Sequence, residues 1–220
     1  MKAVIFDMDG VISDTESIYG DVTEKYLADL GITMSAKELS MKYAGTSYEF
    51  MFGELFPKNN IKVNITEATD TVIALATEAI KKDTRAIPGS LKLIKALHKQ
   101  GVKLAVASGS RMDVIQHIVT ALQIKDQFDA LTSAQEVEHH KPAPDVFLLA
   151  AKRLGIEPED CVVIEDAVSG MSGAKMAGMK VIGLVEEKLP LYPADFLVTS
   201  LEELTPQKMA QLWDSTCYEK

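Results

Sequence analysis

Short apolar runs alternate with amphipathic segments along most of the chain. The runs that predict buried strands are residues 2–6, 104–107, 161–164, 181–185 and 196–198, and residues 130–132 are a weaker candidate. The segments between them carry apolar residues at helical spacing, as at Leu91, Ile94 and Leu97, where Gly101 is the predicted stop. Strands that alternate with helices predict a parallel sheet covered by helices on both faces.

Residues 15–85 break this alternation, because they hold helical patterns and no convincing strand. We therefore expect an α/β protein with a doubly wound, Rossmann-like parallel-sheet core formed by residues 1–14 and 86–220. The inserted residues 15–85 are expected to form an all-helical cap domain.

Polar residues at the starts of several predicted helices form capping-box sequences, in which Ser or Thr is followed three residues later by an acid. These are Ser35 with Glu38, Thr46 with Glu49, and Ser110 with Asp113. They predict that Ser35, Thr46 and Ser110 cap the helices that follow them.

Composition excludes several classes of function. The chain has 23 Lys and Arg residues against 32 Asp and Glu residues, a net charge of −9, which disfavours nucleic acid as a partner. The two cysteines, Cys161 and Cys217, form no disulfide framework, which suits a reducing cytosol. No apolar stretch approaches the roughly 18 residues that a membrane helix requires. We therefore expect a cytoplasmic protein with no membrane partner, and the sequence carries no signal of an oligomeric state.

The most informative stretch follows the first predicted strand, where Asp7 and Asp9 precede Gly10. Residues two apart share a side of an extended chain, and glycine permits a sharp turn directly after them. Two carboxylates at the end of a buried strand are costly unless a cation neutralises them, and Mg²⁺ is a hard ion that prefers oxygen ligands. An EF-hand loop is excluded, because its sixth position requires glycine and Ile12 stands there.

Two other predicted strands end in residues of matching chemistry. Ser108 and Gly109 offer a hydroxyl and an unhindered backbone N–H, and Glu165 and Asp166 form a second acid pair. Taken singly, each is more often an ordinary turn or helix cap. Ligands of open α/β sheets bind at the carboxyl ends of the strands, so the three strand ends together predict one site. Lys141, between two prolines and two histidines of a stiff loop, would supply its positive charge.

Four segments, taken in order, resemble the four motifs of the haloacid dehalogenase superfamily. They are Asp7-Met-Asp-Gly-Val, Val106-Ala-Ser-Gly, Lys141-Pro-Ala-Pro-Asp and Val163-Ile-Glu-Asp-Ala-Val-Ser-Gly. The resemblance covers nearly the whole chain outside the insertion. It is strongest to the β-phosphoglucomutase-like phosphatases, whose helical cap is inserted where residues 15–85 lie here.

The resemblance implies a role for each residue of the site. Asp7 would be the nucleophile that takes the phosphoryl group, and Asp9 the general acid and then the general base. Asp7, the backbone carbonyl of Asp9 and Asp166 would bind Mg²⁺, with Glu165 binding it directly or through water. Ser108, Gly109 and Lys141 would hold the transferring phosphoryl group.

In the resembled branch the cap supplies specificity. Because only two stretches of chain join residues 15–85 to the core, we expect them to move as a lid. Candidate substrate contacts in this chain are Thr15, Glu16, Tyr19, Gly45, Thr46 and Tyr48 of the insertion, with Ser110 and Arg111 of the core. Each of them can equally be a packing or solvated residue.

The function implied is that of a Mg²⁺-dependent phosphatase, which hydrolyses a small phosphorylated metabolite such as a sugar or polyol phosphate through an aspartyl-phosphate intermediate. A sugar-phosphate mutase is one alternative, although Tyr19 and Tyr48 stand where the resembled mutases have a histidine and an arginine. A non-catalytic phosphate-binding protein is another. Halide-releasing members of the superfamily lack the second acid and the metal, so Asp9 and Asp166 disfavour that activity. A dinucleotide binder is disfavoured because no Gly-x-Gly-x-x-Gly follows the first strand.

Overall fold

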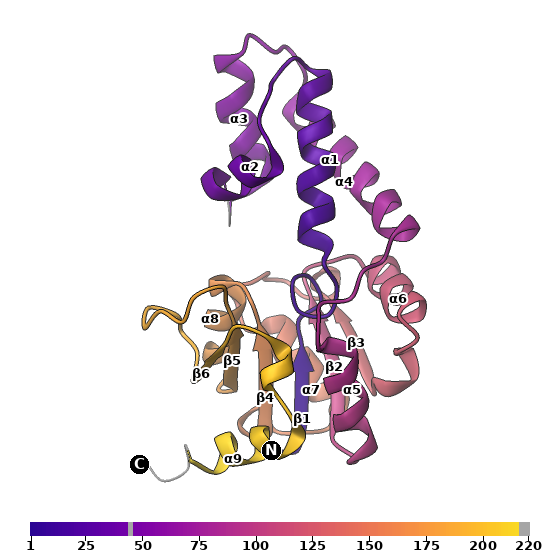
Figure 1. The fold of residues 1–220 in the computed structure, drawn as a ribbon, viewed down its shortest axis with the longest axis vertical. Helices are drawn as coiled ribbons and strands as arrows, with labels where there is room; N and C mark the ends of the chain where they lie inside the picture. Colours follow the sequence, from indigo (N-terminus) through magenta and orange to yellow (C-terminus); the bar gives the residue numbers. More distant parts are fainter. Residues whose placement is uncertain (44–45, 216–220) are drawn as a thin grey trace. The chain divides into compact units, whose positions relative to one another are not determined.

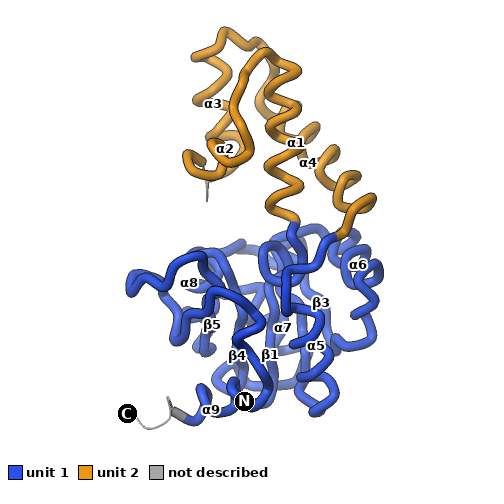
Figure 2. The backbone as a smooth tube through the Cα atoms, viewed as in Figure 1, with its two compact units in different colours: residues 1–14, 85–220 blue, residues 15–84 orange. Residues whose placement is uncertain are grey.

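The computed structural model describes residues 1–43 and 46–215, which form two compact units (Figure 2). One unit consists of Met1–Asp14 and Arg85–Lys220, and the other of Thr15–Thr84. The candidate contact Gly45 and the second cysteine, Cys217, lie outside the described residues.

A sheet of six parallel strands forms the centre of the first unit (Figure 1). The strands are β1 (Ala3–Phe6), β2 (Lys103–Ser108), β3 (Ala130–Ser133), β4 (Cys161–Glu165), β5 (Lys180–Leu184) and β6 (Phe196–Val198). Their order is β3-β2-β1-β4-β5-β6, the order of a doubly wound Rossmann-like sheet. The predicted fold class is therefore confirmed, including the weak strand candidate at residues 130–132.

Helices cover both faces of this sheet. They are α5 (Ser90–Lys99), α6 (Met112–Ala121), α7 (Asp145–Leu154), α8 (Val168–Met176) and α9 (Pro206–Ser215), with four 3₁₀ turns, η1 (Lys125–Gln127), η2 (Ala134–Glu136), η3 (Pro158–Asp160) and η4 (Leu201–Glu203). Helices α7 and α8 pack on the face that carries Ile5, Ala105 and Val163. Helix α9 lies on the opposite face, where Trp213 lines a small pocket with Val162. The strands are buried on both faces, which explains their continuous apolar sequences.

The second unit is all-helical. It contains α1 (Thr15–Asp29), α2 (Ala36–Tyr43), α3 (Tyr48–Lys58) and α4 (Ile65–Lys82). Its own hydrophobic core centres on Phe52 and Phe56, whose stacked rings have centroids 4.9 Å apart, and includes Leu27, Leu55 and Val72. The insertion therefore buries an apolar core of its own.

Two of the three predicted helix caps are wrong. Ser35 and Glu38 form their capping box, but Ser47 and not Thr46 caps α3, by accepting from the N–H of Phe50. Helix α6 begins after Arg111 and has no side-chain cap, because the hydroxyl of Ser110 binds elsewhere. The two errors have different causes. At α3 the neighbouring Ser47 takes the capping role of Thr46, whereas at α6 a tertiary partner, Asp9, takes the hydroxyl of Ser110.

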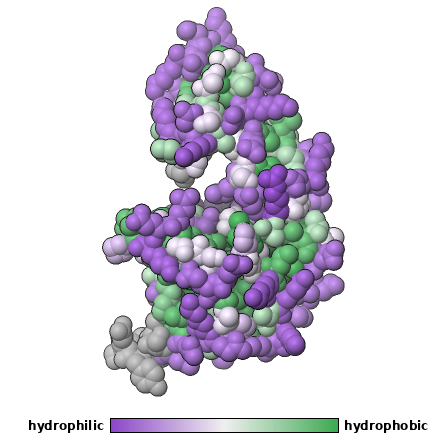
Figure 3. All heavy atoms as spheres, viewed as in Figure 1, coloured by the Kyte–Doolittle hydropathy of each residue, from purple (hydrophilic) through white to green (hydrophobic). Residues whose placement is uncertain are grey.

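In the described part of the chain, no helix is long and apolar enough to cross a membrane. Hydrophilic residues cover most of the face seen in Figure 3, with smaller hydrophobic areas between them. Exposed large hydrophobic side chains include Met41 on α2, Met176 on α8 and Leu191 in the segment between β5 and β6.

Candidate active site

The loop after β1 places two carboxylates at the carboxyl edge of the sheet. The N–H of Asp7 donates to the carbonyl of Ile164 on β4 at 3.0 Å, so Asp7 continues the strand register by one residue. The chain then folds back, with the N–H groups of Ile12 and Ser13 both donating to the carbonyl of Met8. Asp7 is 4% exposed and faces a cluster of polar side chains from neighbouring strand ends.

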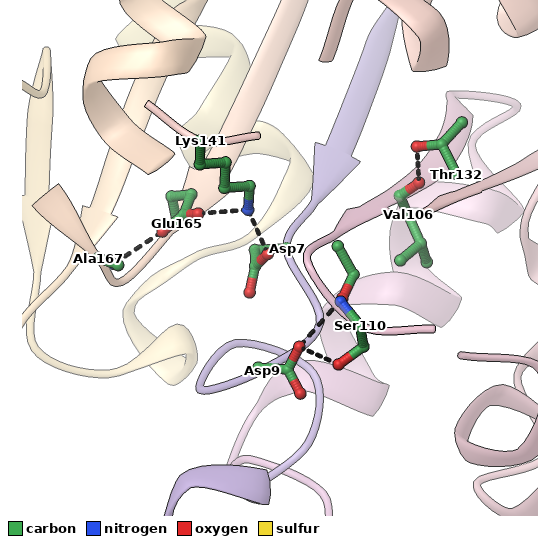
Figure 4. A network of polar contacts seen from close by, with 9 residues as sticks. Asp7, Asp9, Val106, Ser110, Thr132, Lys141, Glu165 and Ala167 are labelled. Carbon is green, nitrogen blue, oxygen red and sulfur yellow. Dashed lines mark hydrogen bonds and ion pairs between the residues drawn. The ribbon is translucent and has the colours of Figure 1, made fainter. Parts of the chain in front are cut away.

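Lys141 joins two of these acids (Figure 4). Its Nζ lies 2.5 Å from Oδ1 of Asp7 and 2.6 Å from Oε1 of Glu165, and stands 4.9 Å from the ring centroid of Phe147. The second oxygen of Glu165 accepts from the N–H of Ala167 at 2.7 Å. Lys141 is thus held by contacts to Asp7 directly after β1, to Glu165 of β4 and to Phe147 of α7.

Asp7 and Lys141 both have pKa values shifted from their ordinary ones. Burial raises the pKa of Asp7 well above its usual value, and the surrounding acids add to that rise, while Lys141 opposes it. Burial alone would lower the pKa of Lys141, but Asp7 and Glu165 together raise it above its ordinary value, so it remains an ammonium at neutral pH. The carboxylates of Asp7, Glu165 and Asp166 outnumber the ammonium of Lys141, which leaves a deficit of positive charge when all three are ionised.

A divalent cation fits that deficit. Asp7, Glu165 and Asp166 each offer a carboxylate oxygen, and the three oxygens lie within 4.8 Å of one another. In octahedral Mg²⁺ coordination, oxygen ligands are about 2.9 Å apart when adjacent and about 4.2 Å apart when opposite, so a bound ion would draw these oxygens closer together. This group of three acids could therefore hold a metal ion.

Two glycines allow this close arrangement of acids. A Cβ built at Gly10, whose φ is +78°, would lie 2.0 Å from Oδ2 of Asp166. A Cβ at Gly170 in α8 would lie 1.6 Å from Oε1 of Glu165. Since real Cβ atoms do not approach so closely, any larger residue at either position would displace an acid of the cluster.

Asp9 belongs to a second polar group, on the β2 side. Its Oδ2 accepts hydrogen bonds from the hydroxyls of Ser108, at 3.0 Å, and of Ser110, at 2.8 Å. The N–H of Ser110 donates to the Ser108 hydroxyl at 2.9 Å. Ser108 is fully buried and Gly109 is exposed beside it.

The structure thus brings together the core residues that the strand ends predicted: Asp7, Asp9, Ser108, Lys141, Glu165 and Asp166. Ser110 joins them through Asp9. Arg111 is exposed and pairs with Asp113 at 3.0 Å.

The described candidates of the insertion, Thr15, Glu16, Tyr19, Thr46 and Tyr48, belong to the helical unit. Thr15 is fully buried there. The hydroxyl of Tyr48 lies 3.2 Å from that of Thr23, and its ring stacks on Phe52. Tyr48 therefore contributes to the packing of this unit.

Sequence reasoning missed Ser133, the last residue of β3, whose hydroxyl binds the carbonyl of Ser110. It also did not foresee that Glu165 orients Lys141, or that Gly170 makes room for Glu165. The available signals for Ser133 were its position at the end of a neighbouring strand and its capping-box spacing to Glu136, and neither predicts a bond to Ser110.

Comparison with known proteins agrees with this geometry. The family model described as haloacid dehalogenase-like hydrolase matches residues 4–184. Hexitol phosphatase B of Escherichia coli (strain K12) is 29% identical over 94% of this chain and 96% of its own length. β-Phosphoglucomutase of Bacillus subtilis (strain 168) is 31% identical over 97% of this chain and 96% of its own. The crystal structure of a β-phosphoglucomutase from Clostridium difficile superposes with a TM-score of 0.80 at 26% identity, covering 99% of both chains.

The chain therefore belongs to the haloacid dehalogenase-like hydrolase family. The predicted family and the predicted hydrolase class are both confirmed.

Proposed function

We propose that this protein is a Mg²⁺-dependent phosphoric monoester hydrolase that acts on a small sugar or polyol phosphate through an aspartyl-phosphate. The observation that carries this proposal is the buried carboxylate of Asp7, which pairs with Lys141 and lies within 4.8 Å of carboxylate oxygens of Glu165 and Asp166. A protein that only binds phosphate does not require a carboxylate nucleophile directed into its anion site, so this arrangement favours catalysis over binding alone.

In the proposed reaction a carboxylate oxygen of Asp7 attacks phosphorus, and the bond between phosphorus and the leaving oxygen breaks. Asp9 gives its proton to that oxygen, which departs as an alcohol. A water molecule then attacks phosphorus, Asp9 takes a proton from the water, and the bond to Asp7 breaks to release phosphate. Two displacements replace one more difficult step.

Each residue around Asp7 has its own electrostatic role in the proposed reaction. The ammonium of Lys141 neutralises a phosphoryl oxygen, while Glu165 keeps that ammonium in position. Asp7, the backbone carbonyl of Asp9 and Asp166 are the proposed Mg²⁺ ligands, with Glu165 close by. A bound Mg²⁺ would spread the negative charge of the transferring group and orient it. Ser108 and the N–H of Gly109 complete the phosphoryl site.

The substrate class rests on the relatives. Hexitol phosphatase B aligns over nearly the whole of this chain, including the helical insertion. We therefore expect phosphate release from hexitol or hexose phosphates with Mg²⁺, and loss of that release when a chelator removes the metal. The test is a screen of the purified protein against phosphorylated polyols, sugars and nucleotides. Turnover that persists unchanged in excess chelator would contradict the metal requirement.

A mutase is the second candidate, because β-phosphoglucomutase of Bacillus subtilis is also similar over nearly the whole chain. We expect hydrolysis without isomerisation, since Tyr19 and Tyr48 stand at the positions of a histidine and an arginine of the resembled mutases. A neutral tyrosine is a poor base at neutral pH and offers no bidentate grip on a second phosphate. The assay supplies β-glucose 1-phosphate with a trace of the 1,6-bisphosphate. Glucose 6-phosphate formed faster than free phosphate would favour the mutase.

A further inference from the structure

A buried hydroxyl on β3 holds the loop that joins β2 to α6. Ser133 ends β3 and is fully buried. Its Oγ donates to the carbonyl oxygen of Ser110 at 2.7 Å. Two residues further on, Oε1 of Gln135 accepts from the N–H of Met112 at 3.3 Å. The loop is therefore fixed to the β3 side at the two residues that flank Arg111.

The orientation of the Ser133 hydroxyl is itself set. Its Oγ accepts from the N–H of Gln135 at 3.1 Å, so its single hydrogen is directed to Ser110. The N–H of Ser133 donates to Oε2 of Glu136 at 3.0 Å, and Arg153 of α7 binds both oxygens of Glu136, at 2.7 and 3.1 Å. Ser133 is thus held by η2, and η2 is in turn held by α7 through Glu136 and Arg153.

Ser110 links Ser133 to Asp9 through hydrogen bonds. Its N–H donates to the hydroxyl of Ser108, which directs the one hydrogen of that hydroxyl to Oδ2 of Asp9. Its own hydroxyl donates to the same oxygen. Both hydrogen bonds to Asp9 therefore depend on where the backbone of Ser110 lies, and Ser133 binds that backbone.

We propose that Ser133 is a positioning residue that orients the proton-transferring carboxyl of Asp9 through the backbone of Ser110. This inference rests on the proposed function, in which Asp9 protonates the leaving oxygen. Ser133 contacts no reacting atom. A displacement of about 1 Å in a catalytic group can lower a rate by up to about 10²-fold, so the loss of one supporting hydroxyl is measurable.

The test compares Ser133→Ala with wild type on two Mg²⁺-dependent reactions, the hydrolysis of D-glucitol 6-phosphate and of 4-nitrophenyl phosphate. The value of kcat/KM includes departure of the leaving group but not the later attack of water. An alkoxide leaving group needs a proton from Asp9, whereas 4-nitrophenolate needs little help. We expect kcat/KM to fall about tenfold for the glucitol phosphate and less than about twofold for the aryl phosphate. Equal losses on both substrates would show a merely structural role and overturn the proposal.

Ser200 provides a matched control. It follows β6, at the opposite edge of the sheet from β3, and forms the same kind of capping box, with Glu203 at the start of η4. Ser200→Ala removes an equivalent cap and is expected to leave the ratio of the two kcat/KM values unchanged. A similar change in that ratio in both variants would overturn the proposal.

A crystal structure of Ser133→Ala gives a readout that does not depend on turnover. Separation of the Ser110 hydroxyl from Asp9 beyond about 3.5 Å would support the proposal, and retention of the 2.8 Å contact would overturn it. If wild type hydrolyses neither substrate, the proposed function fails, and this structure alone decides whether Ser133 positions Asp9.

Discussion

Replacement of Asp7 by Asn is expected to lower phosphatase activity by about 10⁴-fold or more, because the substitution removes the nucleophile. Asn keeps the shape of the side chain but has no anionic oxygen to attack phosphorus. The measurement is Mg²⁺-dependent phosphate release by the purified variant under saturating substrate. Activity within tenfold of wild type would remove Asp7 from the role of nucleophile.

The same variant should fold at least as well as wild type when metal is absent. Burial raises the pKa of Asp7, so its ionised form is costly in the folded protein, and the neutral amide avoids that cost. Lys141 keeps Glu165 as a partner. Thermal unfolding in a chelator checks this expectation, and an unchanged midpoint shows that the loss of activity is not a loss of structure.

Mass spectrometry after an acid quench tests the covalent intermediate. It should find a phosphoryl group on the peptide that contains residue 7 in the wild type and not in the Asp7→Asn variant.

The main features of the core could be predicted because the sheet is buried on both faces. Each strand then appears as an uninterrupted apolar run, and the polar residue that ends the run marks the edge of the sheet. Asp7, Ser108 and Glu165 are such residues, on three adjacent strands. The apolar runs do not encode the order of the strands, so the sequence alone indicated a common edge and no particular set of neighbours.

The supporting contacts could not be predicted, because they join residues that are far apart in the chain. Ser110 has the local pattern of a helix cap, yet its hydroxyl binds Asp9, which is 101 residues away in sequence. Ser133 has the local pattern of a capping box with Glu136, yet its hydroxyl donates to the carbonyl of Ser110, 23 residues earlier in the chain. Local sequence patterns list the possible donors and acceptors, whereas the tertiary fold decides between them.

In the helical insertion, too, local sequence patterns predicted the helices but not the contacts of individual residues. Its helical character followed from the spacing of apolar residues, but the start of α3 was placed one residue early, at Thr46, because Ser47 is an equally good cap. The roles of the substrate-contact candidates stay predictions. Tyr48 illustrates why, because its ring packs on Phe52 and its hydroxyl has a partner in Thr23, so residue type alone did not reveal this packing role.

Replacement of Gly170 by Ala is expected to lower kcat/KM by about 10²-fold, although residue 170 touches no substrate in the proposed mechanism. The added methyl group would lie 1.6 Å from Oε1 and 2.1 Å from Cδ of Glu165. Glu165 is 1% exposed, and its two oxygens already bind Lys141 and the N–H of Ala167. The carboxylate cannot move aside without breaking one of these contacts, so the ammonium of Lys141 loses its fixed position beside Asp7.

The control for Gly170→Ala is Gly53→Ala, also in a helix, where the nearest atom to the new methyl group would be 3.9 Å away. Alanine favours a helix over glycine by about 1 kcal/mol, so the Gly53 variant should be more stable and fully active. At Gly170 the clash should outweigh this gain and lower the thermal midpoint.

Adding Glu165→Asp to Gly170→Ala shortens the displaced side chain by one methylene group. The double variant should recover stability without recovering activity, because the shorter acid no longer reaches Lys141. Wild-type kcat/KM in Gly170→Ala would instead mean that the placement of Glu165 does not control the reaction.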